Sequence, residues 1–180
     1  NMIGASVVVV LVYFSGQLNM SEGTLGAYAI KVAYTKVNLD YSAAFTSAIL
    51  CNILVCLAVL MAYSATDVTG KIFAVFFPIL AFVVGGFEHC VANMYYIPIG
   101  MLSLNNDTYK NMAMKLYGLT ESQLSTLNPG NYIIHNLLPV TIGNIVGGML
   151  FIGVPLYVLY KNQEKIEKES NIQSIGKMYS

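Results

Sequence analysis

Two adjacent side chains, Glu88 and His89, are the only acidic, basic or histidine residues among the 35 between Lys71 and Asp107. The rest of this stretch is mostly apolar. Ionisable groups within a membrane-spanning segment are costly and mark a functional site by default, and a histidine exchanges protons near neutral pH. The alternative is a structural role, in which the side chain bonds loose backbone at a helix break. We favour the structural role for Glu88 and a functional role for His89.

A helix break should position this pair. One straight helix over 35 residues would be about 50 Å long, against about 30 Å for the core of a bilayer. Gly85 and Gly86 stand at the middle of the stretch, and each Gly costs a helix interior about 1 kcal/mol. The sequence therefore predicts two half-helices, Ile72–Val84 and Glu88–Leu104. The second would direct free N–H groups and the positive end of its dipole toward the midplane, where they attract a small anion.

Three asparagines accompany the pair within apolar segments. Asn52 is the strongly polar residue of its segment, and it either lines a pathway or bonds a neighbouring helix. Asn93 follows His89 by four residues and shares its helical face. Asn144 opens the apolar part of the last segment. For Asn93 and Asn144 we favour hydrogen bonds between helices.

Composition gives the class of protein. Only 10% of the 180 residues are charged and 56% are hydrophobic, whereas soluble domains carry about 25% charged residues. The nine basic residues are all Lys and are balanced by nine acidic ones, so no basic surface for nucleic acid is expected. Long apolar stretches with frequent Gly predict an all-α integral membrane protein, with residues 1–180 as a single domain.

Charged residues mark the ends of about four uncharged, apolar membrane spans and of a charged tail. The expected spans are residues 2–18, 43–63, 72–104 broken near 85–88, and 132–160. The charged segment 22–40 is expected to be a connection, partly helical. The mixed-charge residues 161–180 are expected to form a tail, either a short helical extension or a loose segment. We expect this tail to be cytoplasmic, since that orientation puts five lysines inside and four outside.

Other chemistry is not indicated. Haem needs two axial ligands at matching depth, but His135 lies at the watery start of the last span while His89 is at the midplane. The spacing of Cys51, Cys56 and Cys90 fits no metal or redox motif. No arrangement typical of covalent catalysis or nucleotide binding is present. We expect no cofactor, no metal and no enzymatic activity.

The sequence also contains a short internal echo. The run N-M-I-G-A-S at Asn1 resembles N-I-V-G-G-M at Asn144, and both place Gly three residues after Asn in an apolar span. Transporters built from internal repeats show such weak symmetry. If the echo is real, the first span pairs with the last, and the partners of the two middle spans lie upstream of this sequence, which starts inside a span.

Three motifs together resemble a known family. G-F-E-H-C-V-A-N-M-Y-Y-I-P-I-G-M at Gly86–Met101 looks like the signature of the formate/nitrite transporter family. C-N-I-L-V-C-L-A-V-L-M at Cys51–Met61 resembles the fourth transmembrane helix of that family, and N-L-L-P-V-T-I-G-N-I-V-G-G at Asn136–Gly148 resembles the sixth. The motifs occur in the family's order and cover nearly the whole chain, from the third helix of the family onward.

The resemblance implies a fold and a set of site residues. The family has an aquaporin-like bundle of six helices, the second and fifth broken, and forms pentamers with one pore per protomer. By resemblance, His89 faces the centre of the pore, Phe82 lines the cytoplasmic-side constriction and Asn52 lies opposite the histidine. Glu88 is implied to hold the broken helix. The first helix and the second, broken one have no counterpart in this sequence.

The resemblance also implies a function, a channel for small monovalent anions of weak acids such as formate, nitrite or hydrosulfide, in the cell membrane. His89 would favour the protonated acid, which then passes an apolar ring including Phe82, where a bare ion would be poorly solvated. The alternative is a non-transporting membrane anchor subunit of a larger complex. That alternative predicts Glu88 and His89 buried in helix–helix contacts.

Overall fold

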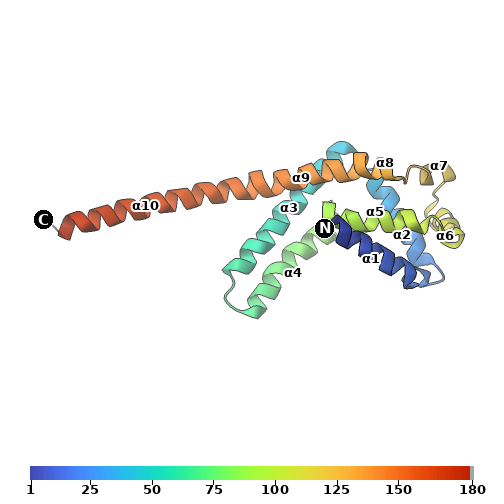
Figure 1. The fold of residues 1–180 in the computed structure, drawn as a ribbon, viewed down its shortest axis with the longest axis horizontal. Coiled ribbons are helices and arrows are strands. Elements are labelled where there is room, and N and C mark those ends of the chain that lie inside the picture. The colour runs from blue at the N-terminus through green and yellow to red at the C-terminus, as the bar shows by residue number, and fades with distance from the viewer. Residues whose placement is uncertain (179–180) are drawn as a thin grey trace.

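The computed structural model describes the backbone of residues 1–178 and the side chains of residues 1–168, and within that part of the chain all regular secondary structure is helical (Figure 1). The first half contains α1 (Met2–Phe14), the 3-10 helix η1 (Gln17–Asn19), α2 (Thr24–Val37), α3 (Tyr41–Ser64), α4 (Val68–Val84) and α5 (Cys90–Ser103). The second half contains α6 (Asp107–Tyr117), α7 (Glu121–Leu124), α8 (Pro129–Asn131), the π-helix η2 (Tyr132–Leu137), α9 (Leu138–Gly148), the π-helix η3 (Met149–Gly153) and α10 (Val154–Met178).

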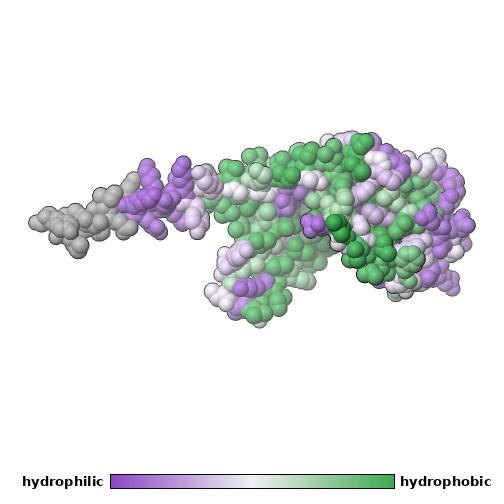
Figure 2. All heavy atoms as spheres, viewed as in Figure 1, coloured by the Kyte–Doolittle hydropathy of each residue, from purple (hydrophilic) through white to green (hydrophobic). Residues whose placement is uncertain are grey.

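Two of the described helices are long and apolar enough to cross a membrane. These are α3, with mean hydropathy 2.4, and the continuous helical run Pro129–Lys168, with mean hydropathy 1.9. Helices α1 and α4 are apolar but shorter. Hydrophobic atoms cover most of the bundle, while hydrophilic ones gather at the α6–α7 end and on α10 (Figure 2). Because lipid rather than water suits such a surface, the fold is that of an all-α integral membrane protein.

The break between α4 and α5 gives the broken helix of the expected fold. Two other boundaries differ from expectation. Helix α1 ends at Phe14, because Gly16 adopts a left-handed φ of 77° and turns the chain into η1. The last helix continues beyond Tyr160 through the segment expected as a tail, as far as Met178. Residues 179–180 of that tail lie outside the described residues.

Segment 22–40 is more than a connection. Its residues Thr24–Val37 form α2, which packs along α5. Ile30, Ala33 and Val37 are fully or almost fully buried, and their spacing of three and four residues places them on one helical face. Lys31 and Lys36 interrupt this stripe in the sequence, and for that reason the apolar face was not recognised from composition.

Small residues bring helices into close contact at the centre of the bundle. Helix α9 lies against α3, with Gly143 facing the carbonyl of Phe45 and Gly147 facing the carbonyl of Ile49. A side chain at either glycine would overlap backbone. Such small-residue contacts let helix backbones approach closely in membranes, where packing drives association.

Enlarging Gly147 should therefore destabilise the fold. Gly147→Leu is expected to cost about 3 kcal/mol, because the added atoms meet the backbone of Ile49 and the two helices must separate. The measurement is the thermal unfolding midpoint of the detergent-solubilised protein. Gly153→Leu in the same helical run is the matched control, since the nearest atom to its added Cβ is 3.5 Å away. Equal midpoints for the two variants would contradict the packing argument.

Candidate functional site

The site begins where α4 ends, at a glycine-dependent C-cap. Gly86 adopts a φ of 66°, a left-handed conformation that costs other residues about 1–2 kcal/mol. The Gly86 N–H donates to the Val83 carbonyl at 3.1 Å, and the Phe87 N–H donates to the Phe82 carbonyl at 3.0 Å. This pair of bonds is the Schellman motif, which satisfies the last carbonyls of a helix. Gly85 precedes it as the C-cap residue.

Side chains cap the start of α5 instead of leaving its N–H groups free. His89 is the N-cap residue, and its Nδ1 accepts from the N–H groups of Val91 at 3.2 Å and Ala92 at 3.3 Å. The Cys90 N–H donates to Oδ1 of Asn144 at 2.9 Å. The expectation of free N–H groups at this helix end was wrong, because a buried helix end requires partners for these donors.

Asn144 joins three parts of the chain at this point. Besides accepting from Cys90, its amide Nδ2 donates to the Ala48 carbonyl of α3 at 2.8 Å and to the Glu88 carbonyl in the break at 3.0 Å. Only 6% of Asn144 is exposed. The residue thus fixes the break relative to α3 and α9, and it acts between helices.

Asn144→Leu is expected to destabilise the protein by about 3 kcal/mol or more. The substitution keeps the approximate size of the side chain but leaves one N–H and two carbonyl groups without their partners, and each buried orphan costs about 1–3 kcal/mol. The unfolding midpoint in detergent measures the loss. Ile145→Leu is the control, since Ile145 is the next residue and is exposed. The interpretation fails if Asn144→Leu unfolds at the midpoint of this control.

The capping bonds also determine the form of the imidazole. An Nδ1 that accepts two backbone N–H bonds carries no proton, so neutral His89 carries its proton on Nε2. The ring is half-buried, and its centroid lies 5.8 Å from that of Phe82 at an interplanar angle of 30°. The structure therefore brings together two of the predicted pore residues, an N–H donor and an aromatic ring.

The side chain of Glu88 has different partners and lies in a network of polar groups. It is 3% exposed. Its Oε1 accepts from Nζ of Lys36 at 2.7 Å, and its Oε2 accepts from Nδ2 of Asn93 at 2.6 Å and Nδ2 of Asn136 at 3.1 Å. Its backbone N–H donates to Oγ of Ser47 at 3.0 Å. The carboxylate thus ties the break to α2, α5 and η2.

Three members of this network, Lys36, Asn136 and Ser47, were not predicted. Asn136 is fully buried and additionally donates to the carbonyl of Lys36 at 2.9 Å. Because a buried carboxylate within a membrane span requires a cationic partner, Glu88 itself was the signal that one lysine must lie at the same depth. Sequence alone did not show which lysine, since Lys36 belongs to a segment interpreted as a connection.

Asn52 makes a helix–helix bond. Its Nδ2 donates to the backbone carbonyl of Asn144. The added Cβ of a residue at position 148 would lie 2.6 Å from the same Nδ2, so Gly148 provides the space for the bond. The side chain is intermediate in exposure. Two roles were left open for Asn52, lining a pathway or bonding a neighbouring helix. The described contacts include the second, a bond from α3 to α9.

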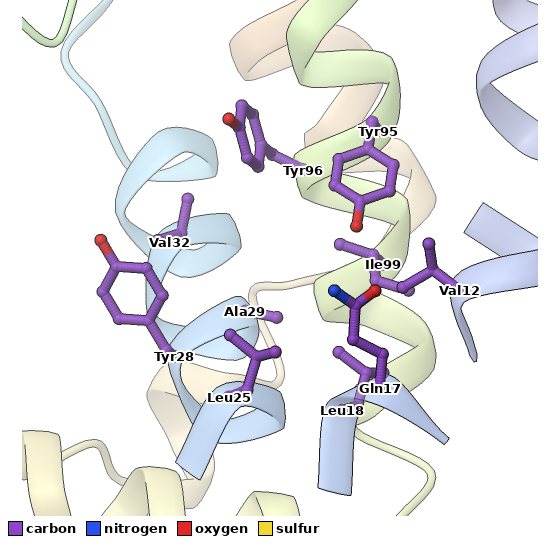
Figure 3. Close-up of a pocket in the computed structure, with 10 residues that line it drawn as sticks. All are labelled: Val12, Gln17, Leu18, Leu25, Tyr28, Ala29, Val32, Tyr95, Tyr96 and Ile99. Atoms are coloured by element: carbon purple, nitrogen blue, oxygen red, sulfur yellow. The ribbon is translucent and has the colours of Figure 1, made fainter. Parts of the chain in front are cut away.

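A separate cavity of about 200 Å³ lies between α1, η1, α2 and α5 (Figure 3). Its lining is largely apolar, with Gln17 and the rings of Tyr28, Tyr95 and Tyr96 among its residues. None of the predicted site residues lines it. Within the described residues no cluster of three or more His, Cys, Asp or Glu side chains is placed to hold a metal ion.

The broken helix, its capped ends and the apolar exterior define a class of protein, a helical membrane protein with a polar centre of the kind found in transporters and channels. Comparison with known proteins gives the family. The profile described as formate/nitrite transporter matches residues 1–158, and the chain belongs to this family. The family consists of channels and transporters and not of enzymes.

Individual relatives agree with this assignment. The formate channel FocA of Haemophilus influenzae is 40% identical over 154 residues, which are 86% of this chain and 54% of the relative. A solved pentameric formate channel with formate bound is 36% identical and superposes with a TM-score of 0.79, covering 89% of this chain and 62% of that one. An ion channel of the same family gives a TM-score of 0.66 at 30% identity. The chain spans about half the length of the curated relatives it matches.

Proposed function

We propose that this chain is part of a channel that conducts small monovalent anions of weak acids, such as formate, nitrite or hydrosulfide, across the cell membrane. The observation that carries the proposal is the placement of His89 beside Phe82 at a capped helix break, in a fold that superposes on a formate-bound channel. The site is built for binding without reaction, because it contains a donor and an apolar ring but no nucleophile held beside a base.

The donor in this proposal is Nε2–H of His89. Its Nδ1 accepts from two N–H groups at the start of α5, so the helix end polarises the ring and strengthens the opposite N–H as a donor. An anion or its conjugate acid at the midplane accepts this hydrogen bond in place of those lost from water. Because Glu88 is paired with Lys36, its negative charge does not repel the anion.

Phe82 makes the channel selective for the neutral acid over a bare anion, because the two differ in how much they depend on solvation by water. An apolar ring offers no hydrogen bond, and a bare anion passing it would lose water without compensation, whereas the neutral acid loses far less. The weak acid anion therefore takes a proton from water before this position, crosses in its protonated form and returns the proton to water beyond it. Ions of strong acids remain charged at every physiological pH and are excluded.

Flux measurements test the proposal. The longer protein that contains this chain, reconstituted in liposomes, is expected to conduct formate, nitrite and hydrosulfide and to exclude chloride. The alternative, a non-transporting anchor subunit of a larger complex, predicts no flux of any of these. Glu88 is as buried as that alternative requires, but His89 is only half-buried, and this difference favours the channel.

The assembly in this proposal is a homopentamer, with the charged segment that follows residue 160 in the cytoplasm. Support comes from the pentameric state named for the superposed channel and from the charge of α10, which includes Lys161 and Lys168. Native mass spectrometry of the detergent-solubilised protein should give five copies. A monomer that conducts at the full rate would contradict the pentamer, and protease cleavage of the tail from outside intact cells would contradict the orientation.

A further inference from the structure

Ser47 binds the first N–H group that follows the C-cap of α4. That C-cap uses the N–H groups of Gly86 and Phe87, so the N–H of Glu88 is the next donor in the break. It donates to Oγ of Ser47, on α3, at 3.0 Å. The hydroxyl of Ser47 therefore lies beside the residue that precedes His89.

A second contact holds the same part of α3 against the break. Nδ2 of Asn144 donates to the carbonyl of Ala48 at 2.8 Å and to the carbonyl of Glu88 at 3.0 Å. Two consecutive residues of α3 are thus joined to Glu88, Ser47 directly and Ala48 through Asn144. The position of Ser47 beside the break follows from both links and does not depend on its exposure.

The hydroxyl of Ser47 is turned away from its own helix. A serine or threonine inside a helix can donate to the carbonyl four residues earlier. Five hydroxyls of this chain do so, those of Ser6, Thr35, Thr46, Ser64 and Ser103. Among the described residues, the one hydrogen bond of the Ser47 side chain is the bond that it accepts from Glu88. The proton of this half-buried hydroxyl is therefore free to donate.

We propose that Ser47 is a second hydrogen-bond donor to the conducted molecule, and that it makes the channel prefer weak acids with two oxygen atoms, such as formate and nitrite, over hydrosulfide. This inference rests on the proposed function and names the substrate class within it. One oxygen accepts from Nε2–H of His89 and the other accepts from O–H of Ser47, so the two donors come from the two sides of the break.

The preference follows from the acceptors that each substrate offers. Formate, nitrite and their conjugate acids carry two oxygens on one central atom, and each oxygen can accept a separate hydrogen bond. Hydrosulfide has a single heavy atom, and sulfur is a weak acceptor. Because Oγ of Ser47 already accepts from the N–H of Glu88, its own O–H is polarised and donates more strongly. A second donor therefore stabilises a two-oxygen acid at the break far more than it stabilises hydrosulfide.

Flux through the longer protein in liposomes tests the inference, with formate, nitrite and hydrosulfide as the probes. Ser47→Ala should lower formate and nitrite flux about fivefold and hydrosulfide flux by less than about twofold, as expected for one lost hydrogen bond. Ser47→Thr keeps a hydroxyl and should restore the ratio of formate to hydrosulfide flux. Thr46→Val is the matched control, because the neighbouring hydroxyl already donates to the carbonyl of Ser42.

A purely structural role predicts a different result. If Ser47 serves to hold the N–H of Glu88, or if its proton goes to an acceptor elsewhere in the longer protein, Ser47→Ala lowers the unfolding midpoint in detergent and reduces the three fluxes by the same factor. An unchanged ratio of formate to hydrosulfide flux overturns the inference, whatever the midpoint.

The channel and this inference can fail separately. A wild-type protein that conducts none of the three probes overturns the proposed function, and the preference with it. A wild-type protein that conducts all three, with the same flux ratio in Ser47→Ala, overturns the preference alone. If Ser47→Ala does not fold, Ser47→Cys decides by the same ratio, because a thiol is close in size to the hydroxyl but is a weak donor.

Discussion

Lys36→Met is expected to destabilise the protein by about 3–5 kcal/mol, the largest effect on stability among the variants considered. The substitution leaves the carboxylate of Glu88, whose side chain is 4% exposed, without its cation. Asn93 and Asn136 still donate to Oε2, but Oε1 loses its partner at 2.7 Å. Removing one member of a buried ion pair is costly because the remaining charge stays desolvated.

The unfolding midpoint in detergent measures this effect, and two further variants isolate its cause. Lys36→Met combined with Glu88→Gln should recover most of the loss, because a neutral amide no longer requires a cation. Lys31→Met, on the same helix, should change the midpoint little, because its Nζ lies over the ring of Tyr28 at 5.9 Å on a partly exposed surface. If the double variant is no more stable than Lys36→Met, the ion pair is not the source of the effect.

Sequence patterns predicted the parts of this fold that depend on local chemistry. Gly85 and Gly86 indicated the end of a helix, because Gly destabilises a helix interior, and the structure shows Gly86 in the left-handed conformation that ends α4. The lengths of the apolar stretches indicated α3 and the final helix, because a helix needs about 20 apolar residues to cross the core of a bilayer. Asn144 was predicted to bond between helices, and its three bonds do so.

The parts that were not predicted depend on distant contacts. Lys36 and Glu88 are 52 residues apart, and no pattern within α2 indicates which of its lysines turns inward. Asn144, which caps α5, is 54 residues away from Cys90 in the sequence. A sequence pattern could therefore show where the helix starts but not which side chain accepts the hydrogen bond from its first N–H group. Long-range pairing of this kind is decided by packing between helices.

His89→Phe is expected to reduce anion flux about 10- to 100-fold at every pH between 5 and 8, the largest effect on function. Phenylalanine keeps a ring beside Phe82 but removes the Nε2–H donor, and a hydrogen bond to a charged group contributes about 1.5–3 kcal/mol. Each 1.36 kcal/mol corresponds to a factor of ten in rate. The loss should extend over the whole range, because an imidazole whose Nδ1 accepts two N–H bonds acts as a neutral donor without first gaining a proton.

The measurement is flux of formate, nitrite and hydrosulfide through the longer protein in liposomes, with the same variants checked for folding by their unfolding midpoints. His89→Phe also removes a cap from α5, so His89→Asn is needed beside it. Asparagine at an N-cap position accepts backbone N–H bonds as His89 does, but its side chain is too short to place a donor where Nε2–H lies.

His135→Phe is the control for the loss of a histidine, since His135 is exposed and packs against Tyr41. A stable His89→Asn protein with low flux would separate the donor from the cap. Flux of wild-type magnitude and pH profile in both His89 variants would make His89 a capping residue alone, and the proposed role of Nε2–H would be wrong.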